Sequence, residues 1–302
     1  MGRAPRAPDG GAGRVRARHR RGRRDHDRGR QYRQRHPGDD DGHRAGNRTG
    51  GFRAGAGAGL HPDRDDHRHQ PGRPHPGPDR AGGPVVSALF PLIVTGAQTR
   101  RGGKVLVGPV DLTLEGAGCT VVIGPNGAGK TSLLRLLHGI ARCHAGRIAW
   151  QVDAASARSA QSFVFQRPVM LRRSVAQNLA YPLTIRRTPR AEVTARVAHW
   201  AEAVGLSAML DRPAPSLSGG EQQKLALARA LITEPELVFL DEPCASLDGR
   251  ATREIEAILT RVSAAGTRLI LTTHDMGQAR RLADHVVFLH AGRVSETAPA
   301  AR

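Results

Sequence analysis

The stretch GPNGAGKT, Gly124–Thr131, follows the apolar run CTVVI and precedes a leucine-rich segment. It matches the pattern G-x-x-x-x-G-K-[S/T] at every fixed position, between a predicted strand and a predicted helix. The glycines allow successive backbone N–H groups to curl around an anion at the start of the helix. Lys130 adds a point charge for the outer phosphates of a nucleotide, and the Thr131 hydroxyl is a ligand for Mg²⁺. The stretch therefore predicts a nucleoside triphosphate site on a strand–loop–helix unit.

A second predicted strand, LVFL at 237–240, ends in two acids, Asp241 and Glu242. Carboxylates at the carboxyl end of a buried parallel strand lie where open α/β sheets bind their ligands. We expect Asp241 to hold Mg²⁺ through its hydration shell. We expect Glu242, one residue on, to orient or deprotonate an attacking water.

Apolar runs alternate with helical patterns from about residue 88 onward, which predicts an α/β domain over 88–296. Runs that are apolar at every position indicate parallel strands covered on both faces. Residues of about 172–220 have mostly helical patterns, with a predicted capping box at Ser174 and Gln177. We expect them to form a helical subdomain within the α/β domain. The predicted strands are PLIV, KVLVGPVDLTL, CTVVIG, SFVFQ, LVFL, RLILTT and HVVFLH.

Four further motifs stand in order around these two sites. They are VFQRP with Gln166, LSGGEQQ at Leu217–Gln223, ASLD ending at Asp248, and TTHD with His274. Together with the phosphate-binding loop and LDEP, they make the chain resemble the ATP-binding cassette family, the nucleotide-binding subunits of ABC transporters. The resemblance spans the whole predicted domain and implies a P-loop NTPase fold of the ABC type.

The resemblance implies an ATP hydrolase that uses ATP and Mg²⁺ and works as a head-to-tail dimer of two copies. The implied catalytic residues are Glu242, His274 and Gln166. The implied Mg²⁺ residues are Thr131, Gln166 and Asp241, partly through water. The LSGG turn and Asp248 of one copy would face the ATP held by the other copy. The implied ATP-binding residues are Gly124, Pro125, Asn126, Gly127, Ala128, Gly129, Lys130, Thr131, Ser132, Ser218, Gly219, Gly220 and Asp248.

The chain departs from the family at the adenine contact. The family usually places an aromatic residue before the phosphate-binding loop to stack on adenine, and the stretch TGAQTRRGGKVLVGP at 95–109 has none. Arg100 or Arg101 stands near the expected position, and a guanidinium plane can stack on a base. Weaker or less selective base binding is the open alternative.

The sequence contains one cassette, and no apolar run comes near the roughly 20 residues that span a bilayer. Within the family this favours a stand-alone importer subunit that binds a separate transmembrane permease. A periplasmic or extracellular binding protein would act with it indirectly. The expected location is cytoplasmic, peripheral on the inner membrane through the permease.

Three stretches resemble the ATP-binding subunits of bacterial tungstate importers. They are FVFQRPVMLRRSVAQNLAYPL, DEPCASLDGRATREIEAIL and THDMGQARRLADHVVFLHAGRV. We therefore expect tungstate or a similar oxyanion as the cargo. An amino-acid, phosphate or molybdate importer is the alternative within the same class.

Residues 1–84 differ sharply from the rest in composition. They hold 20 Arg, 10 Asp and no Lys or Glu, so more than half of the +19 net charge lies there. Large apolar residues are nearly absent, so burial cannot offset chain entropy and we expect disorder. The chain has only three lysines, which indicates GC-rich coding DNA, and we hypothesise that translation starts near Val85 or Val86.

The alternative for this basic segment is a nucleic-acid tether on a soluble cassette ATPase, with strongly salt-dependent binding. We expect no nucleic-acid partner. The three cysteines, Cys119, Cys143 and Cys244, are far apart and odd in number, which favours a reducing compartment over a disulfide framework. We interpret Cys143 and Cys244 as packing residues.

Overall fold

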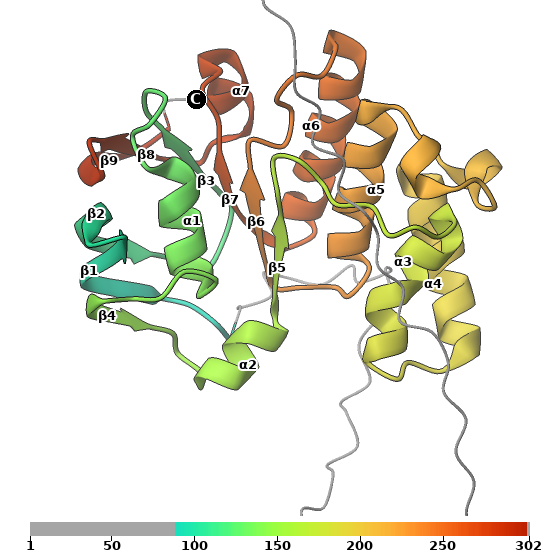
Figure 1. Ribbon diagram of the computed structural model, residues 1–302, viewed down its shortest axis with the longest axis horizontal. Coiled ribbons are helices and arrows are strands. Elements are labelled where there is room, and N and C mark those ends of the chain that lie inside the picture. Colours follow the sequence, from blue (N-terminus) through green and yellow to red (C-terminus); the bar gives the residue numbers. More distant parts are fainter. Residues whose placement is uncertain (1–87, 301–302) are drawn as a thin grey trace, which may run out of the picture. The chain divides into compact units, whose positions relative to one another are not determined.

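The computed structural model describes residues 88–300, and the disorder predicted for residues 1–84 falls outside that range. A six-stranded sheet has the order β5-β6-β7-β3-β8-β9 (Figure 1). Its first five strands run parallel and β9 pairs antiparallel to β8, which confirms the predicted α/β class. The strands are β3 (Cys119–Ile123), β5 (Gln161–Val164), β6 (Leu237–Asp241), β7 (Arg268–Thr272), β8 (His285–His290) and β9 (Arg293–Pro299).

The parallel strands are buried on both faces because alternate side chains enter two separate cores. Phe239 of β6 packs in the core that contains α1 (Lys130–His138), whereas Leu240 packs in the core on the opposite face. Helix α1 also contacts β1 and β2, so it lies between two sheets. The other face is covered by α5 (Gly219–Leu231), α6 (Gly249–Ala264) and α7 (Met276–Leu282). This two-sided burial explains the continuous apolar runs.

A second, antiparallel sheet has the order β2-β1-β4. It consists of β1 (Leu92–Arg101), β2 (Lys104–Leu114) and β4 (Ala145–Ala149). The apolar runs predicted β1 and β2, but neither β4 nor β9 was predicted. Both are edge strands whose sequences, AGRIA and RVSETAP, have few large apolar residues, so periodicity gives little signal there.

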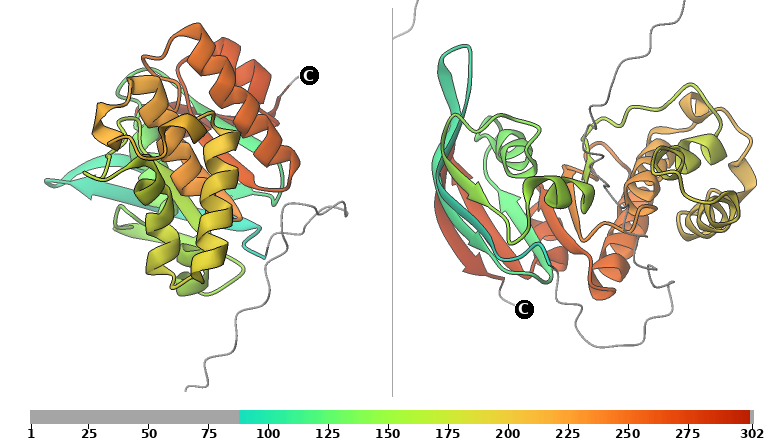
Figure 2. Two further views of the ribbon diagram at one scale, coloured as in Figure 1. Left: turned by 90° about the vertical axis from the view of Figure 1, so that its right-hand side faces the viewer. Right: turned by 90° about the horizontal axis from the view of Figure 1, so that it is seen from below.

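The residues between β5 and α5 are mainly helical. They contain α3 (Val175–Ile185), α4 (Arg190–Ala203) and the short 3₁₀ turns η1 (Ser207–Met209) and η2 (Ala214–Ser216). The predicted capping box is present at the start of α3. Figure 2 shows α3 and α4 side by side, across the six-stranded sheet from β1, β2 and β4. Within residues 88–300, no helix combines the length and apolar character needed to cross a bilayer.

The strand order gathers loops that are far apart in the sequence. Strands β5, β6, β7 and β3 are neighbours and parallel, so their carboxyl ends meet at one edge of the sheet. The phosphate-binding loop follows β3, Glu242 follows β6, His274 follows β7 and Gln166 follows β5. The remaining helix, α2 (Ala154–Ser159), precedes β5.

Candidate active site

The loop between β3 and α1 is built to approach an anion closely. Gly129 precedes α1 with φ +101°, and a side chain there would come within 2.7 Å of Val107 Cγ2. The position therefore requires glycine, both for its backbone and for its space. The Lys130 ammonium is buried and donates to the carbonyls of Gly124 at 2.9 Å and Pro125 at 3.3 Å. The lysine thus lies folded back over the loop to which the motif assigns a phosphate.

Asp241 at the end of β6 faces the first turn of α1. Its Oδ1 accepts hydrogen bonds from the Thr131 hydroxyl at 2.8 Å and the Thr272 hydroxyl at 3.0 Å. The residue is only 2% exposed, and among residues 88–300 no cationic side chain forms an ion pair with it. A buried carboxylate with hydroxyl neighbours and no paired cation is suited to a hard divalent ion, which prefers oxygen ligands.

Thr272 is a site residue that the sequence analysis missed. Its hydroxyl also accepts the backbone N–H of Glu242 at 2.9 Å, so it fixes both acids. The sequence carried a signal for this residue, because Thr272 is the first residue of the TTHD motif and lies near the end of the predicted strand RLILTT. Its pairing with Asp241 became visible only with the β6–β7 register.

Glu242 is where the sequence-predicted groups converge. Its Oε2 accepts a hydrogen bond from Gln166 Nε2 at 3.0 Å and lies 3.4 Å from His274 Nδ1. Its Oε1 lies 3.8 Å from Lys130 Nζ. The Glu242 backbone has φ +46°, an uncommon conformation for a non-glycine residue. Such strain is often found at functional sites, where the surrounding structure holds it in place.

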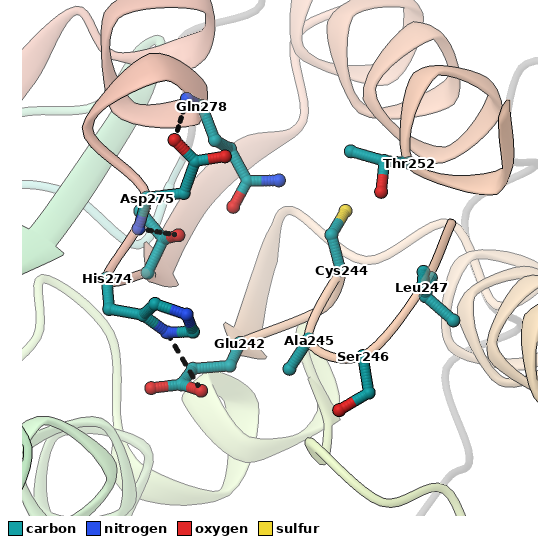
Figure 3. A pocket seen from close by; sticks show the side chains of 10 residues that line it. Glu242, Cys244, Ala245, Ser246, Leu247, Thr252, His274, Asp275 and Gln278 are labelled. Atoms are coloured by element: carbon teal, nitrogen blue, oxygen red, sulfur yellow. Dashed lines mark hydrogen bonds and ion pairs between the residues drawn. The ribbon is translucent and has the colours of Figure 1, made fainter. Parts of the chain in front are cut away.

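A pocket of about 160 Å³ opens beside this carboxylate. Figure 3 shows Glu242 and His274 meeting at one end and Cys244, Thr252 and Gln278 gathered toward the other. Burial raises the pKa of the Cys244 thiol to about 11. The thiol is thus held neutral, and all three cysteines predicted to be unpaired are free.

The predicted LSGG turn does not contact the phosphate-binding loop of its own chain in any hydrogen bond or ion pair of residues 88–300. Ser218 instead caps α5, and its hydroxyl and backbone N–H donate to Glu221, whose pKa they lower. Asp248 caps α6 through the Ala251 N–H at 2.8 Å. A Cβ on Gly220 would lie 3.2 Å from Ala251 Cβ, so the two caps are neighbours. They form a second cluster of predicted site residues.

The strands beside the phosphate-binding loop decide which of the two candidate arginines faces it. Gly129 abuts Val107 and the carbonyl of Leu106, so β2 borders the loop on that side. On β1, Ala97 and Thr99 are buried in one row, and regular alternation over 97–101 puts Arg101 in the same row. Arg100 lies on the opposite face, where its guanidinium contacts Gln98. Of the two candidate arginines, Arg101 is therefore on the face of the loop.

The sequence model of the ABC transporter family matches residues 107–245. The ATP-binding protein of a tungstate uptake system from Peptoclostridium acidaminophilum is 39% identical over 207 residues, covering 68% of this chain and 97% of that protein. The chain belongs to the ABC transporter family. It is thus an ABC ATPase, which binds and hydrolyses ATP, as the sequence predicted.

Other relatives of this ABC ATPase carry different import names. A nickel import ATP-binding protein from Rhodobacter capsulatus is 41% identical over 224 residues, covering 68% of this chain and 88% of that protein. A sulfate/thiosulfate import ATP-binding protein from Thermosynechococcus vestitus is 38% identical over 193 residues, covering 62% of this chain and 57% of that protein. The names differ in cargo and agree in being import ATP-binding proteins.

Solved structures agree on the fold. A subunit of an ABC transporter complex from Clostridium perfringens superimposes with a TM-score of 0.64 at 26% identity, covering 70% of this chain and 89% of that one. A dimeric ATP-binding cassette bound to ADP and Pi gives a TM-score of 0.63 at 21% identity, covering 70% and 99%. The predicted ABC-type P-loop fold is confirmed.

Proposed function

We propose that this ABC ATPase is the ATP-hydrolysing subunit of an importer and that its cargo is an oxyanion, tungstate first. The observation that carries the enzymatic part is the meeting of Lys130, Gln166 and His274 around the Glu242 carboxylate. The cargo part rests on the tungstate relative, which this chain covers almost end to end. The sulfate/thiosulfate and nickel names keep other oxyanions and metal ions as the alternatives to be tested.

Mg²⁺ fits the pair Thr131 and Asp241. Their oxygens lie 2.8 Å apart, and the Asp241 carboxylate is buried beside two hydroxyls without an ion pair among the described residues. Bound there with ATP, the ion would neutralise charge on the outer phosphates. In this proposal the Gln166 side chain also faces the Mg²⁺ position and would reach the ion or a water bound to it.

Glu242 is the proposed base for the attacking water. Its carboxylate is held by the Gln166 amide and faces His274, so the acceptor oxygen is oriented before the water arrives. His274 is exposed. In this proposal it would donate a hydrogen bond to the γ-phosphate and orient the attacking water. Lys130 exchanges the carbonyls of Gly124 and Pro125 for the β- and γ-phosphates, since its ammonium is a mobile point charge on a flexible stem.

A second copy supplies the rest of the site. The cluster of Ser218, Gly219, Gly220 and Asp248 makes no described contact with the loop of its own chain, although the motif is complete. In a head-to-tail dimer the helix start at Ser218 would face the ATP of the partner copy, with backbone N–H groups toward the γ-phosphate. ATP then becomes part of the interface, so binding closes the dimer and hydrolysis opens it.

The permease is proposed to dock near Gln166 and α3. Val169 is 71% exposed, and Phe165, Tyr181 and Ile185 are also exposed large hydrophobic residues. The Arg229 guanidinium donates to the Val169 carbonyl at 2.8 Å and to Asn178 Oδ1 of α3 at 3.1 Å, so this segment is connected to the helical region. Docking there would place the chain at the inner face of the cell membrane, with a separate binding protein delivering cargo outside.

Element accumulation in the host, at limiting supply, tests the import proposal. Wild type is compared with Lys130→Ala, and Lys104→Ala serves as the control because Lys104 is exposed on β2. The panel is tungsten, molybdenum, sulfur, phosphorus, nickel and iron. Selective loss of tungsten in Lys130→Ala alone is the expected result. Selective loss of another element would replace tungstate as the cargo, and uptake unchanged across the panel would contradict the oxyanion importer.

A further inference from the structure

The helices α5 and α6 begin next to each other, at the second cluster of predicted site residues. Each helix start is capped within its own helix: Ser218 accepts the Glu221 N–H at 3.4 Å, and Asp248 accepts the Ala251 N–H at 2.8 Å. Within residues 88–300, neither cap is hydrogen-bonded to the other helix. The place of one cap relative to the other is therefore decided by how α5 and α6 lie against each other.

The first turns of the two helices are in close contact. A Cβ on Gly220 would lie 3.2 Å from the Ala251 Cβ, which is closer than ordinary van der Waals contact. The glycine thus lets α5 approach α6 with no side chain between them. Because only a hydrogen atom and a methyl group meet there, this contact limits the distance between the helices and leaves the angle between them free.

A second contact lies one turn further along both helices. Lys224, four residues after Gly220, donates from its Nζ to Glu254 Oε2 at 2.9 Å, and Glu254 stands three residues after Ala251. Within residues 88–300 this is the only hydrogen bond or ion pair between α5 and α6. Contacts on two successive turns fix the angle between the helices as well as their distance.

The Glu254 carboxylate is held by both of its oxygens. Oε2 accepts from Lys224, and Oε1 accepts from Arg250 Nε at 3.0 Å within α6. The hydrogen bond from Lys224, and after it the one from Arg250, lowers the pKa of Glu254, so the carboxylate is charged at neutral pH. Arg250 is 87% exposed, whereas Lys224 is 14% exposed. The sheltered partner of the carboxylate is therefore the one that comes from the neighbouring helix.

We propose that Lys224 and Glu254 are positioning residues for the ATP of the second copy: their ion pair sets the helix start at Ser218 beside the start at Asp248, so that both face one nucleotide. This inference rests on the proposed head-to-tail dimer. Within residues 88–300 neither residue bonds to the phosphate-binding loop or to Asp241 of its own chain. A partly exposed ion pair contributes little to folding, so its effect lies in the geometry of the cluster.

Charge reversal tests the proposal in full-length protein that carries Glu242→Gln, the variant proposed to accumulate the ATP-bound dimer. Lys224→Glu places two carboxylates at the contact and Glu254→Lys places two ammonium groups there, so like charges push the helix starts apart. With ATP and Mg²⁺, we expect each reversal to raise the dimer dissociation constant, measured by sedimentation, at least about tenfold, because both copies carry the change. The ATP affinity of the dilute monomer should stay within about twofold, and the melting temperature within about 3 °C.

The double variant Lys224→Glu/Glu254→Lys restores opposite charges at the same contact. Its dimer dissociation constant should return to within about threefold of that of the parent protein. Glu192→Lys is the matched control, because it reverses the same charge in an ion pair of α4, 2.7 Å from Arg196, and should dimerise as the parent does. Single reversals that dimerise as tightly as the parent, or a double variant as weak as the single ones, would overturn the proposal.

The failure of this inference can be told apart from failure of the proposed dimer. If Glu242→Gln itself stays monomeric with ATP, the dimer on which the inference rests is wrong. If Glu242→Gln dimerises and the single reversals dimerise equally well, only the positioning role is wrong. A weaker dimer whose melting temperature has fallen well beyond about 3 °C would mean that the ion pair supports folding instead.

Discussion

The hydroxyl of Thr131 donates a 2.8 Å hydrogen bond to Asp241, across 110 positions of sequence. This contact joins the first turn of α1 to the end of β6 and brings together the two oxygens proposed to hold Mg²⁺. The Thr272 hydroxyl holds the same Asp241 oxygen from β7. The proposed Mg²⁺ position is thus set by three neighbouring elements, which are the strands β6 and β7 and the helix α1.

Asp241→Asn tests this position. The amide keeps the shape but loses the charge that a hard divalent ion prefers. We expect the Mg²⁺ concentration for half-maximal ATPase activity to rise by about tenfold or more, because the charged group that holds the ion through its hydration shell is lost. The measurement is a Mg²⁺ titration of the hydrolysis rate at saturating ATP. Asp211→Asn, at an exposed acid, is the control, and an unchanged titration in Asp241→Asn would exclude Asp241 as a metal residue.

Lys130→Ala removes the proposed phosphate contact. The buried ammonium has two carbonyls as its near partners, and we expect it to exchange them for the phosphates. The ATP dissociation constant should rise at least about a hundredfold, since a charge-assisted contact in a sheltered site is lost. Equilibrium binding of a fluorescent ATP analogue measures this directly. Lys104→Ala should bind as wild type does, and tight binding by Lys130→Ala would refute the assignment.

Substitutions of Arg101 and Arg100 test which of the two arginines stacks on the nucleobase of ATP. Arg101 continues the buried row of Ala97 and Thr99 toward the loop, whereas Arg100 turns to Gln98. A guanidinium stacked on the base contributes on the order of 1 kcal/mol, so Arg101→Ala should raise the KM for ATP about fivefold. Arg100→Ala should leave it unchanged. The reverse order of the two KM values would mean that the base lies on the other face of β1.

His138 predicts a pH dependence of folding. Burial between Phe163 and Phe239 lowers the pKa of His138 below its ordinary 6.5. The unfolded chain then takes up the proton more readily than the folded chain, so stability present above about pH 6.5 is lost as the pH falls through and below it. The melting temperature of the wild type should drop between about pH 7.5 and about pH 5.5. His138→Leu should show a smaller drop, and exposed His199→Leu the wild-type drop; equal drops in all three would contradict the assignment.

The places of the candidate site residues in the fold were easier to predict from the sequence than the elements around them. Asp241 ends a strand that is otherwise apolar, and Lys130, Glu242 and His274 come after strands that are mostly apolar, so element and position could be predicted from the local pattern. Edge strands such as β4 and β9 carry little apolar signal and were missed. Thr272 was missed because its partner Asp241 comes from another strand and is brought beside it by the β6–β7 register.

The faces of β1 on which Arg100 and Arg101 lie could likewise not be predicted from the sequence. Both arginines are exposed, and alternation alone could not assign a face because bulges interrupt the β1–β2 pairing. The observed register assigns the irregularities within 97–101 to β2, so β1 alternates regularly there. The face of each arginine follows from that register and from no feature of the sequence by itself.

The central claim is that Glu242 acts as the base of an ATP site completed by a second copy. It is tested most directly by Glu242→Gln, with ATP hydrolysis, ATP affinity and oligomeric state measured on the same preparation. Glu296→Gln, at an exposed acid on β9, serves as the control. We predict hydrolysis at least about a hundredfold slower, unchanged ATP affinity and a stable ATP-bound dimer. Hydrolysis at the wild-type rate by Glu242→Gln would contradict the account.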